Sequence, residues 1–213
     1  NTLVIFTADN GPWLSYGDHA GSAKPLREGK GTTWEGGTRV PCVMRWPAKI
    51  NPGTTSNRMA MTIDLLPTLA GIIGADLPKH RIDGLDIAPV LFSNDPAANP
   101  HEAYFFYYAS NELQALISGD GRWKLLLPHT YRTLAGNPGG SGGKPVNYSQ
   151  AKVAKPELYD LENDLPESTD VADQHPEILA KLLTLADQAR TDLGDSLTKS
   201  KPTGQREPGR LPK

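Results

Sequence analysis

The sequence predicts the carboxyl-terminal end of an α/β domain followed by a small α+β subdomain. Three observations support this prediction. The chain opens almost directly with Leu3-Val4-Ile5-Phe6, an apolar run that is typical of a strand buried on both faces of a parallel sheet. A helical pattern follows a second short strand, and three closely spaced short strands then precede a long amphipathic helix. Because a buried strand is an unusual first element, we expect the chain to be part of a longer product.

The α/β part is expected to span residues 1–97. The segment 40–46 has the composition of a second short strand. A helix should follow, with Asp64 as its N-cap and Gly74 as its C′ residue. Four apolar residues fall on one side of this helix at helical spacing, namely Ile63, Leu66, Leu69 and Ile73. A shorter helix is expected over 86–92.

The α+β subdomain is expected to span residues 98–197. Three short strands separated by tight turns predict an antiparallel meander, over 104–109, 113–118 and 123–127. The Gly-rich stretch Gly136–Gly143 predicts a flexible loop or linker. The segment 158–161 could add an edge strand.

The chain should end in a helix and a tail. The spacing of apolar residues predicts a helix over 176–193, with Gly194 ending it. Its inward-facing residues should be Ile178, Leu179, Leu182, Leu185, Ala186 and Ala189. Residues 198–213 contain Pro, Gly and basic residues, so this tail is expected to be disordered.

Composition excludes several classes of function. The formal net charge is −2, which gives no electrostatic case for binding nucleic acid. No apolar run approaches the roughly 20 residues that a membrane span needs. Cys42 is the only cysteine, so neither an internal disulfide nor a cysteine-based zinc site can form. We interpret Cys42 as a small buried hydrophobic residue of a strand.

Two neighbouring polar residues, Asp9 and Asn10, follow the first strand. The carboxyl edge of an open α/β sheet is where ligands bind. A carboxylate and an amide oxygen are hard ligands of the kind that Ca²⁺ and Mg²⁺ prefer. However, Asp-Asn-Gly after a strand is also a common turn, so this pair alone leaves both readings open.

A Gly-rich stretch, Pro25 to Pro41, carries a second candidate. Glycines on both sides of Lys30 would let the backbone approach a ligand closely. The Lys30 ammonium could then neutralise a tetrahedral oxyanion. The alternative is a solvated lysine in an exposed loop.

Together, these two elements resemble the sulfatase family of the alkaline-phosphatase-like superfamily, which includes arylsulfatases and N-acetylgalactosamine-6-sulfatases. The resemblance rests on Asp9-Asn10-Gly11-Pro12, followed about twenty residues later by Leu-Arg-Glu-Gly-Lys-Gly-Thr-Thr-Trp-Glu-Gly-Gly-Thr-Arg-Val-Pro. Weaker pieces match in order further along: Ile63 to Leu69, Ile82-Asp83-Gly84, Trp123-Lys124-Leu125, and Leu158 to Leu161 with Glu167 following. The resemblance implies an alkaline-phosphatase-like α/β fold and sulfuric ester hydrolysis.

The resemblance also implies roles for individual residues. Asp9 and Asn10 match metal ligands, normally to Ca²⁺ and alternatively to Mg²⁺, and Asp9 would also lie beside the sulfate ester oxygens. Lys30 matches the lysine that contacts the sulfate and the bridging oxygen. Gly17-Asp18-His19 resembles a Gly-x-His element, so His19 would face the substrate; the alternative is a loop histidine making local hydrogen bonds.

Other residues of the loop are interpreted as scaffold rather than as chemistry. Trp34, Glu35 and Arg39 fall in this group, and Glu35 could pair with Arg39 to hold the loop.

The sequence departs from the family at the nucleophile. Sulfatases use a formylglycine made in a Cys/Ser-x-Pro/Ala-x-Arg motif, and the surroundings of Cys42 do not match it. The formylglycine and the upstream metal ligands are expected in a missing N-terminal part. We therefore expect this chain alone to hydrolyse no sulfate ester and to bind Ca²⁺ poorly, because two ligands cannot fill about six to eight positions.

Two alternatives remain open: a phosphodiester or phosphonate hydrolase of the same superfamily, and a non-catalytic relative that recognises sulfated glycans. The resemblance also implies a sulfated small molecule or glycan as the substrate and a periplasmic or extracellular location. The oligomeric state cannot be predicted.

Overall fold

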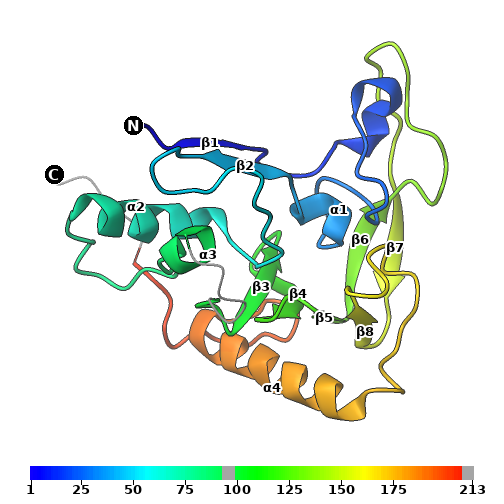
Figure 1. Ribbon diagram of the computed structural model, residues 1–213. Coiled ribbons are helices and arrows are strands. Elements are labelled where there is room, and N and C mark those ends of the chain that lie inside the picture. The colour runs from blue at the N-terminus through cyan, green and yellow to red at the C-terminus, as the bar shows by residue number, and fades with distance from the viewer. Residues whose placement is uncertain (93–98, 208–213) are drawn as a thin grey trace, which may run out of the picture.

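The computed structural model describes residues 1–92 and 99–207 (Figure 1). Strands β1 (Val4–Thr7) and β2 (Cys42–Arg45) form a two-stranded antiparallel ribbon in which Val4 pairs with Arg45. The prediction that the first strand is buried in a parallel sheet is wrong for this structure: Phe6 is 70% exposed, and the described strands pair only in antiparallel fashion. Cys42 is likewise exposed rather than buried, as is most of β2.

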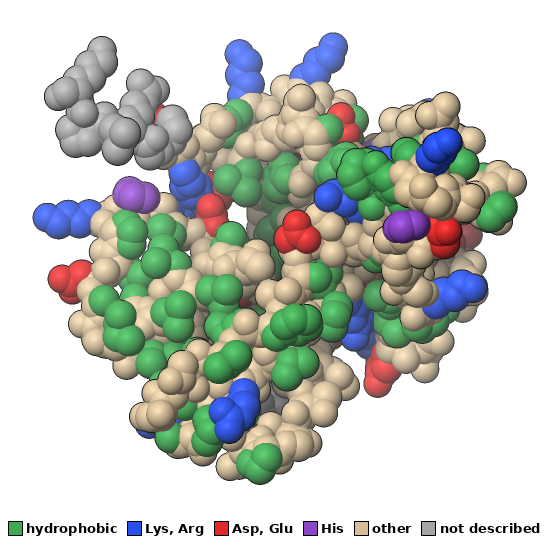
Figure 2. Space-filling model, turned by 90° about the horizontal axis from the view of Figure 1, so that it is seen from above, with side chains coloured by type: hydrophobic (Ala, Val, Ile, Leu, Met, Phe, Trp, Pro, Cys, Tyr) green, Lys and Arg blue, Asp and Glu red, His purple; other side chains and the backbone are tan. Residues whose placement is uncertain are grey.

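Two short helices lie in the connection between β1 and β2, and three more follow β2. They are η1 (Leu14–His19), α1 (Glu35–Thr38), η2 (Thr62–Asp64), α2 (Leu65–Ile73) and α3 (Ala88–Phe92). The predicted end of α2 is confirmed, because Gly74 adopts the left-handed conformation with φ 68°. The apolar stripe of this helix is nevertheless exposed, and the helix buries Pro67, Thr68 and Ala70 instead. Figure 2 shows that hydrophobic side chains gather on the side of the molecule that is seen from above.

The predicted meander is confirmed. Strands β3 (Ala103–Tyr108), β4 (Glu112–Ser118), β5 (Trp123–Leu126) and β8 (Glu157–Asp160) form one antiparallel sheet in the order β3-β4-β5-β8. Strand β8 is therefore an edge strand, as expected. Helix α4 (Pro176–Leu193) lies along this sheet (Figure 1). The main core lies between them, because Leu182, Leu185 and Ala186 pack with Leu113, Leu116 and Leu125.

A second two-stranded ribbon was not predicted. It consists of β6 (His129–Thr133) and β7 (Ser149–Val153), paired in antiparallel fashion. The connection between these strands, residues 134–148, lies beside η1 (Figure 1). The glycines predicted to give a flexible loop serve a close contact instead: a Cβ on Gly17 would lie 1.9 Å from the Gly140 carbonyl oxygen.

The start of the predicted tail is packed. The Thr203 amide donates to the Thr191 carbonyl at 2.9 Å, and Arg206 pairs with Asp192 at 3.0 Å. Disorder is therefore not observed over 198–207, whereas 208–213 lies outside the described residues. The expected boundary after residue 97 also lies outside them. None of the described helices is long and apolar enough to cross a membrane.

Candidate functional site

The end of β1 and the Gly-rich loop lie against each other. The Gly11 amide donates to the Gly37 carbonyl at 2.9 Å, and the Lys30 amide donates to the Pro12 carbonyl at 2.9 Å. The approach requires glycine, because a Cβ on Gly11 would lie 1.8 Å from the Gly36 carbonyl oxygen. The two segments singled out in the sequence are thus held side by side by their backbones.

The predicted metal ligands lie at the start of this contact. Asp9 is exposed and Asn10 is partly buried. The Asn10 amide nitrogen donates to the Gly11 carbonyl at 2.9 Å, which leaves its oxygen as the ligand atom. One carboxylate and one amide oxygen suit a hard divalent cation in type but not in number. Among the described residues, no group of three or more His, Cys, Asp and Glu side chains could hold a metal ion.

Lys30 is partly buried at the other side of the contact. Its Nζ lies 5.2 Å from the centroid of the Trp13 ring, within the range of a cation–π interaction. Its carbonyl accepts a hydrogen bond from Nε of Arg132 on β6 at 3.0 Å. The Arg132 guanidinium in turn lies 4.8 Å from the Tyr148 ring. The unpredicted ribbon therefore fixes the backbone of the candidate sulfate-binding lysine.

His19 ends η1 and is exposed. Its Nε2 lies 3.7 Å from Oδ1 of Asp18, and Asp18 also accepts a hydrogen bond from the Gly142 amide at 3.2 Å. These contacts are the local interactions expected if His19 is only a loop histidine. A role of His19 toward a substrate stays a prediction.

A buried charge cluster lies beneath the Gly-rich loop. The Nζ of Lys124, on β5, lies 2.9 Å from Glu35 and 2.8 Å from Glu167. All three side chains are at most 3% exposed. The Glu35 amide also donates to Glu167 at 2.8 Å. Burial raises the pKa of Glu167, Lys124 lowers it, and the neighbouring Glu35 carboxylate raises it.

Trp34 and Arg27 complete the attachment of the loop. Trp34 is fully buried, and the Arg27 guanidinium lies 3.5 Å from its ring centroid. Arg27 also donates to the Glu167 carbonyl at 2.8 Å. The predicted scaffold pair is confirmed, because Arg39 lies 3.6 Å from Glu35.

Sequence reasoning missed the roles of Lys124, Glu167 and Arg132. The first two belong to pieces of the resemblance, but nothing local shows that they meet. The one available signal was a lysine within the apolar strand Trp123 to Leu126, since a buried lysine requires a partner.

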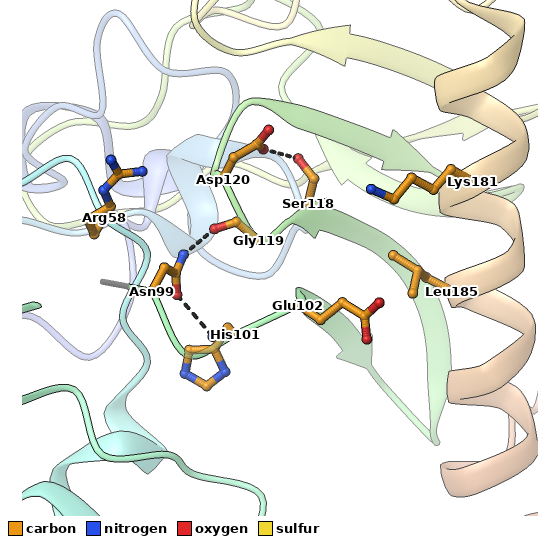
Figure 3. Close-up of a pocket in the computed structure, with 9 residues that line it drawn as sticks. All are labelled: Arg58, Asn99, His101, Glu102, Ser118, Gly119, Asp120, Lys181 and Leu185. Carbon is orange, nitrogen blue, oxygen red and sulfur yellow. Dashed lines mark hydrogen bonds between the residues drawn. The ribbon is translucent and has the colours of Figure 1, made fainter. Parts of the chain in front are cut away.

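A separate pocket of about 450 Å³ lies where β3 begins and β4 ends, beside α4 (Figure 3). Charges of both signs line it, with the cations Arg58 and Lys181 and the anions Glu102 and Asp120. Its remaining lining residues are Asn99, His101, Ser118, Gly119 and Leu185. None of the predicted site residues contributes to it.

The chain is similar to known proteins over most of its length. Residues 1–75 match the Sulfatase family model. Arylsulfatase A of Homo sapiens is 37% identical over 192 residues, which cover 86% of this chain and 37% of that protein. Among solved structures, PsFucS1 sulfatase from Pseudoalteromonas sp. superposes with a TM-score of 0.70 at 24% identity, covering 89% of this chain and 37% of that one.

A further solved structure, Ps i-CgsB in complex with k-i-k-neocarrahexaose, has a TM-score of 0.66 and is 26% identical, covering 88% of this chain and 36% of that one. The fold class is therefore the α/β class of the alkaline-phosphatase-like proteins. Within that class, the chain belongs to the sulfatase family. It spans little more than a third of the length of these relatives.

Proposed function

We propose that this chain supplies part of the active site of a sulfuric ester hydrolase. Lys30 binds the sulfate group and the bridging ester oxygen. Asp9 and Asn10 provide oxygen ligands to a divalent cation, Ca²⁺ or alternatively Mg²⁺. The observation that carries the proposal is the docking of the Lys30 segment on the strand end through the Lys30–Pro12 backbone hydrogen bond of 2.9 Å.

The charges suit this chemistry. A bound cation would neutralise the sulfate oxygens and polarise the sulfur. The Lys30 ammonium would stabilise the negative charge that develops on the ester oxygen as the alcohol leaves. Asp9 would lie beside the ester oxygens and orient them relative to the cation, while His19 would face the departing alcohol.

The supports of the loop favour such a role. Electrostatic stabilisation is effective when the charged group is held in place before the substrate arrives. Arg132 fixes the Lys30 carbonyl, and the buried Lys124–Glu35 pair fixes the helix that follows Lys30. The binding energy then need not order a Gly-rich loop.

The proposed substrate and location rest on the family to which the chain belongs. A sulfated glycan or sulfated small molecule is the proposed substrate. The complex of the similar structure Ps i-CgsB with k-i-k-neocarrahexaose supports a glycan. We propose a periplasmic or extracellular location. The formylglycine motif does not occur in this sequence, so the chain alone should not turn over 4-nitrophenyl sulfate. Hydrolysis by the purified chain would refute this last point.

Sulfate binding to the chain tests the role of Lys30. We would titrate sodium sulfate against sodium chloride at equal ionic strength and follow the backbone amides of Gly29 and Gly31 by NMR. These amides should shift with sulfate in the unsubstituted chain and in Lys152→Gln, a control at an exposed lysine. They should not shift in Lys30→Gln. Equal shifts in Lys30→Gln would overturn the proposed role.

A further inference from the structure

Trp13 has an unusual position beside Lys30. It is 44% exposed, whereas Trp34 is fully buried and the two other tryptophans, Trp46 and Trp123, are partly buried. The Lys30 ammonium lies 5.2 Å from its ring centroid. An exposed indole thus lies next to the ammonium group that the proposed function assigns to the sulfate.

The indole is held rather than free. Tyr16 contacts it edge-on, with ring centroids 5.1 Å apart and an interplanar angle of 72°. The next residue, Leu14, packs on Gly29, where a Cβ would lie 2.8 Å from the Leu14 Cγ. The Ser15 carbonyl accepts hydrogen bonds from the loop after β6 at 2.9 and 3.0 Å. Trp13 therefore has a fixed backbone and a solvent-facing ring.

The two cation–π pairs at the Gly-rich loop differ in how deeply the tryptophan ring is buried. Arg27 covers the ring of Trp34, and that ring is fully buried, as expected for a contact that stabilises the fold. The pair of Lys30 with Trp13 leaves nearly half of the tryptophan in water. A cation–π pair at such an exposed position adds little to the stability of the chain, whereas the free part of the indole ring suits a ligand that covers it.

We propose that Trp13 is a specificity-determining residue that stacks on the ring of the alcohol whose sulfate ester is held by Lys30. This inference rests on the proposed function. In a sulfate ester of a sugar or a phenol, the sulfur is joined to the ring through one oxygen, or through one oxygen and one methylene. The sulfate and the ring are therefore separated by a few ångströms, like the Lys30 ammonium and the Trp13 ring. Both a pyranose and an arene present a flat apolar face to an indole.

Binding to the chain tests the inference without turnover. The four tryptophan indole N–H signals would be followed by NMR, with the Trp13 signal assigned by its loss in Trp13→Ala. The ligands are inorganic sulfate, N-acetylglucosamine 6-sulfate and phenyl sulfate, with unsulfated N-acetylglucosamine as the ring without the anion. The matched control is Trp46→Phe, and Lys30→Gln reports on the proposed function.

The sulfated ring compounds should shift the Trp13 signal. Their dissociation constants should rise about fivefold in Trp13→Ala and stay unchanged in Trp46→Phe. Inorganic sulfate should bind the unsubstituted chain and Trp13→Ala equally well. A dependence on Trp13 for only one of the two sulfate esters would support the inference and identify the ring as a sugar or an arene.

Two outcomes would overturn it, and they are distinguishable. If both sulfate esters bind through Lys30 with the same affinity in Trp13→Ala, the inference fails and the proposed function stands. If neither sulfate nor its esters bind in a manner that Lys30→Gln abolishes, the proposed function fails and the inference fails with it.

Discussion

Replacing Lys124 with methionine removes the cation that lies between two buried carboxylates. The ammonium lies 2.9 Å from Glu35 and 2.8 Å from Glu167, and Lys124 is fully buried. Methionine fills a similar volume, so packing changes little while the positive charge is lost. The variant Lys124→Met therefore leaves two carboxylates in a medium that solvates them poorly.

The expected cost is large. Removing one partner of a buried ion pair typically destabilises a protein by about 3–5 kcal/mol, because the other charge is left uncompensated. For a chain of this length, about 1 kcal/mol corresponds to about 2–4 °C in Tm, so Lys124→Met should lower Tm by about 6–20 °C. The matched variant Lys152→Met, at an exposed position on β7, should change the free energy of unfolding by less than about 0.5 kcal/mol.

Urea unfolding followed by circular dichroism measures both variants. The double variant Lys124→Met with Glu35→Gln should be less destabilised than the sum of the two single variants, because one of the uncompensated charges is gone. The penalty should also depend on pH. Without Lys124 the pKa of Glu167 rises further above its usual 4.5, so the folded state binds a proton that the unfolded state releases. The penalty should therefore shrink as the pH falls toward 4.5.

A loss of less than about 1 kcal/mol in Lys124→Met at pH 7 would contradict this reasoning. So would a penalty that stays constant between pH 5 and pH 7. Either result would mean that water reaches the cluster, or that the carboxylates are already protonated when Lys124 is present.

Three other predictions test individual contacts. Gly11→Ala should lower the free energy of unfolding by about 1–3 kcal/mol in urea titrations, because its Cβ would lie 1.8 Å from the Gly36 carbonyl oxygen; an unchanged midpoint would show that the contact is loose. Cys42 is exposed, so one equivalent of Ellman's reagent should react with the folded chain about as fast as with the urea-unfolded chain. A thiol that is protected in the folded chain would show that Cys42 is buried after all. Burial lowers the pKa of His129 below 6.5, so the unfolded state binds the extra proton and stability should fall as the pH drops through 6.5. Unfolding free energies between pH 5 and pH 7.5 should lose this dependence in His129→Asn, and an identical slope would assign the effect to other groups.

Patterns within single elements were readable from the sequence. The limits of α4 agree with the prediction, because Pro176 suits the first turn and Gly194, with φ 80°, cannot continue the helix. The three meander strands follow from short apolar runs between tight turns. The ribbon of β6 and β7 was missed because its strands are mostly polar and lack an alternating pattern.

The sequence did not show which apolar faces of the helices and strands are buried. The stripe that contains Leu66 and Ile73 has the spacing of a core-facing helix side, yet these residues are 55% and 73% exposed. Phe6 on β1 is exposed for the same reason, since no described layer covers either surface. Periodicity shows that a face is apolar, whereas burial depends on what else is present to pack against it.

The candidate site shows a second limit of prediction from sequence, because contacts between residues far apart in the chain cannot be recognised. Asp9, Asn10 and Lys30 were found because their family pattern is local in sequence, and their segments meet through backbone contacts that only glycine permits. The groups that hold Lys30 in place come from far along the chain: Arg132 is 102 residues away, and Lys124 is 89 residues from Glu35. Such pairs leave no periodic signal. A Gly-rich loop would lose much conformational entropy on binding an anion. The four-stranded sheet that carries Lys124 and the β6–β7 ribbon that carries Arg132 remove part of that cost in advance, so both would contribute to the proposed anion site.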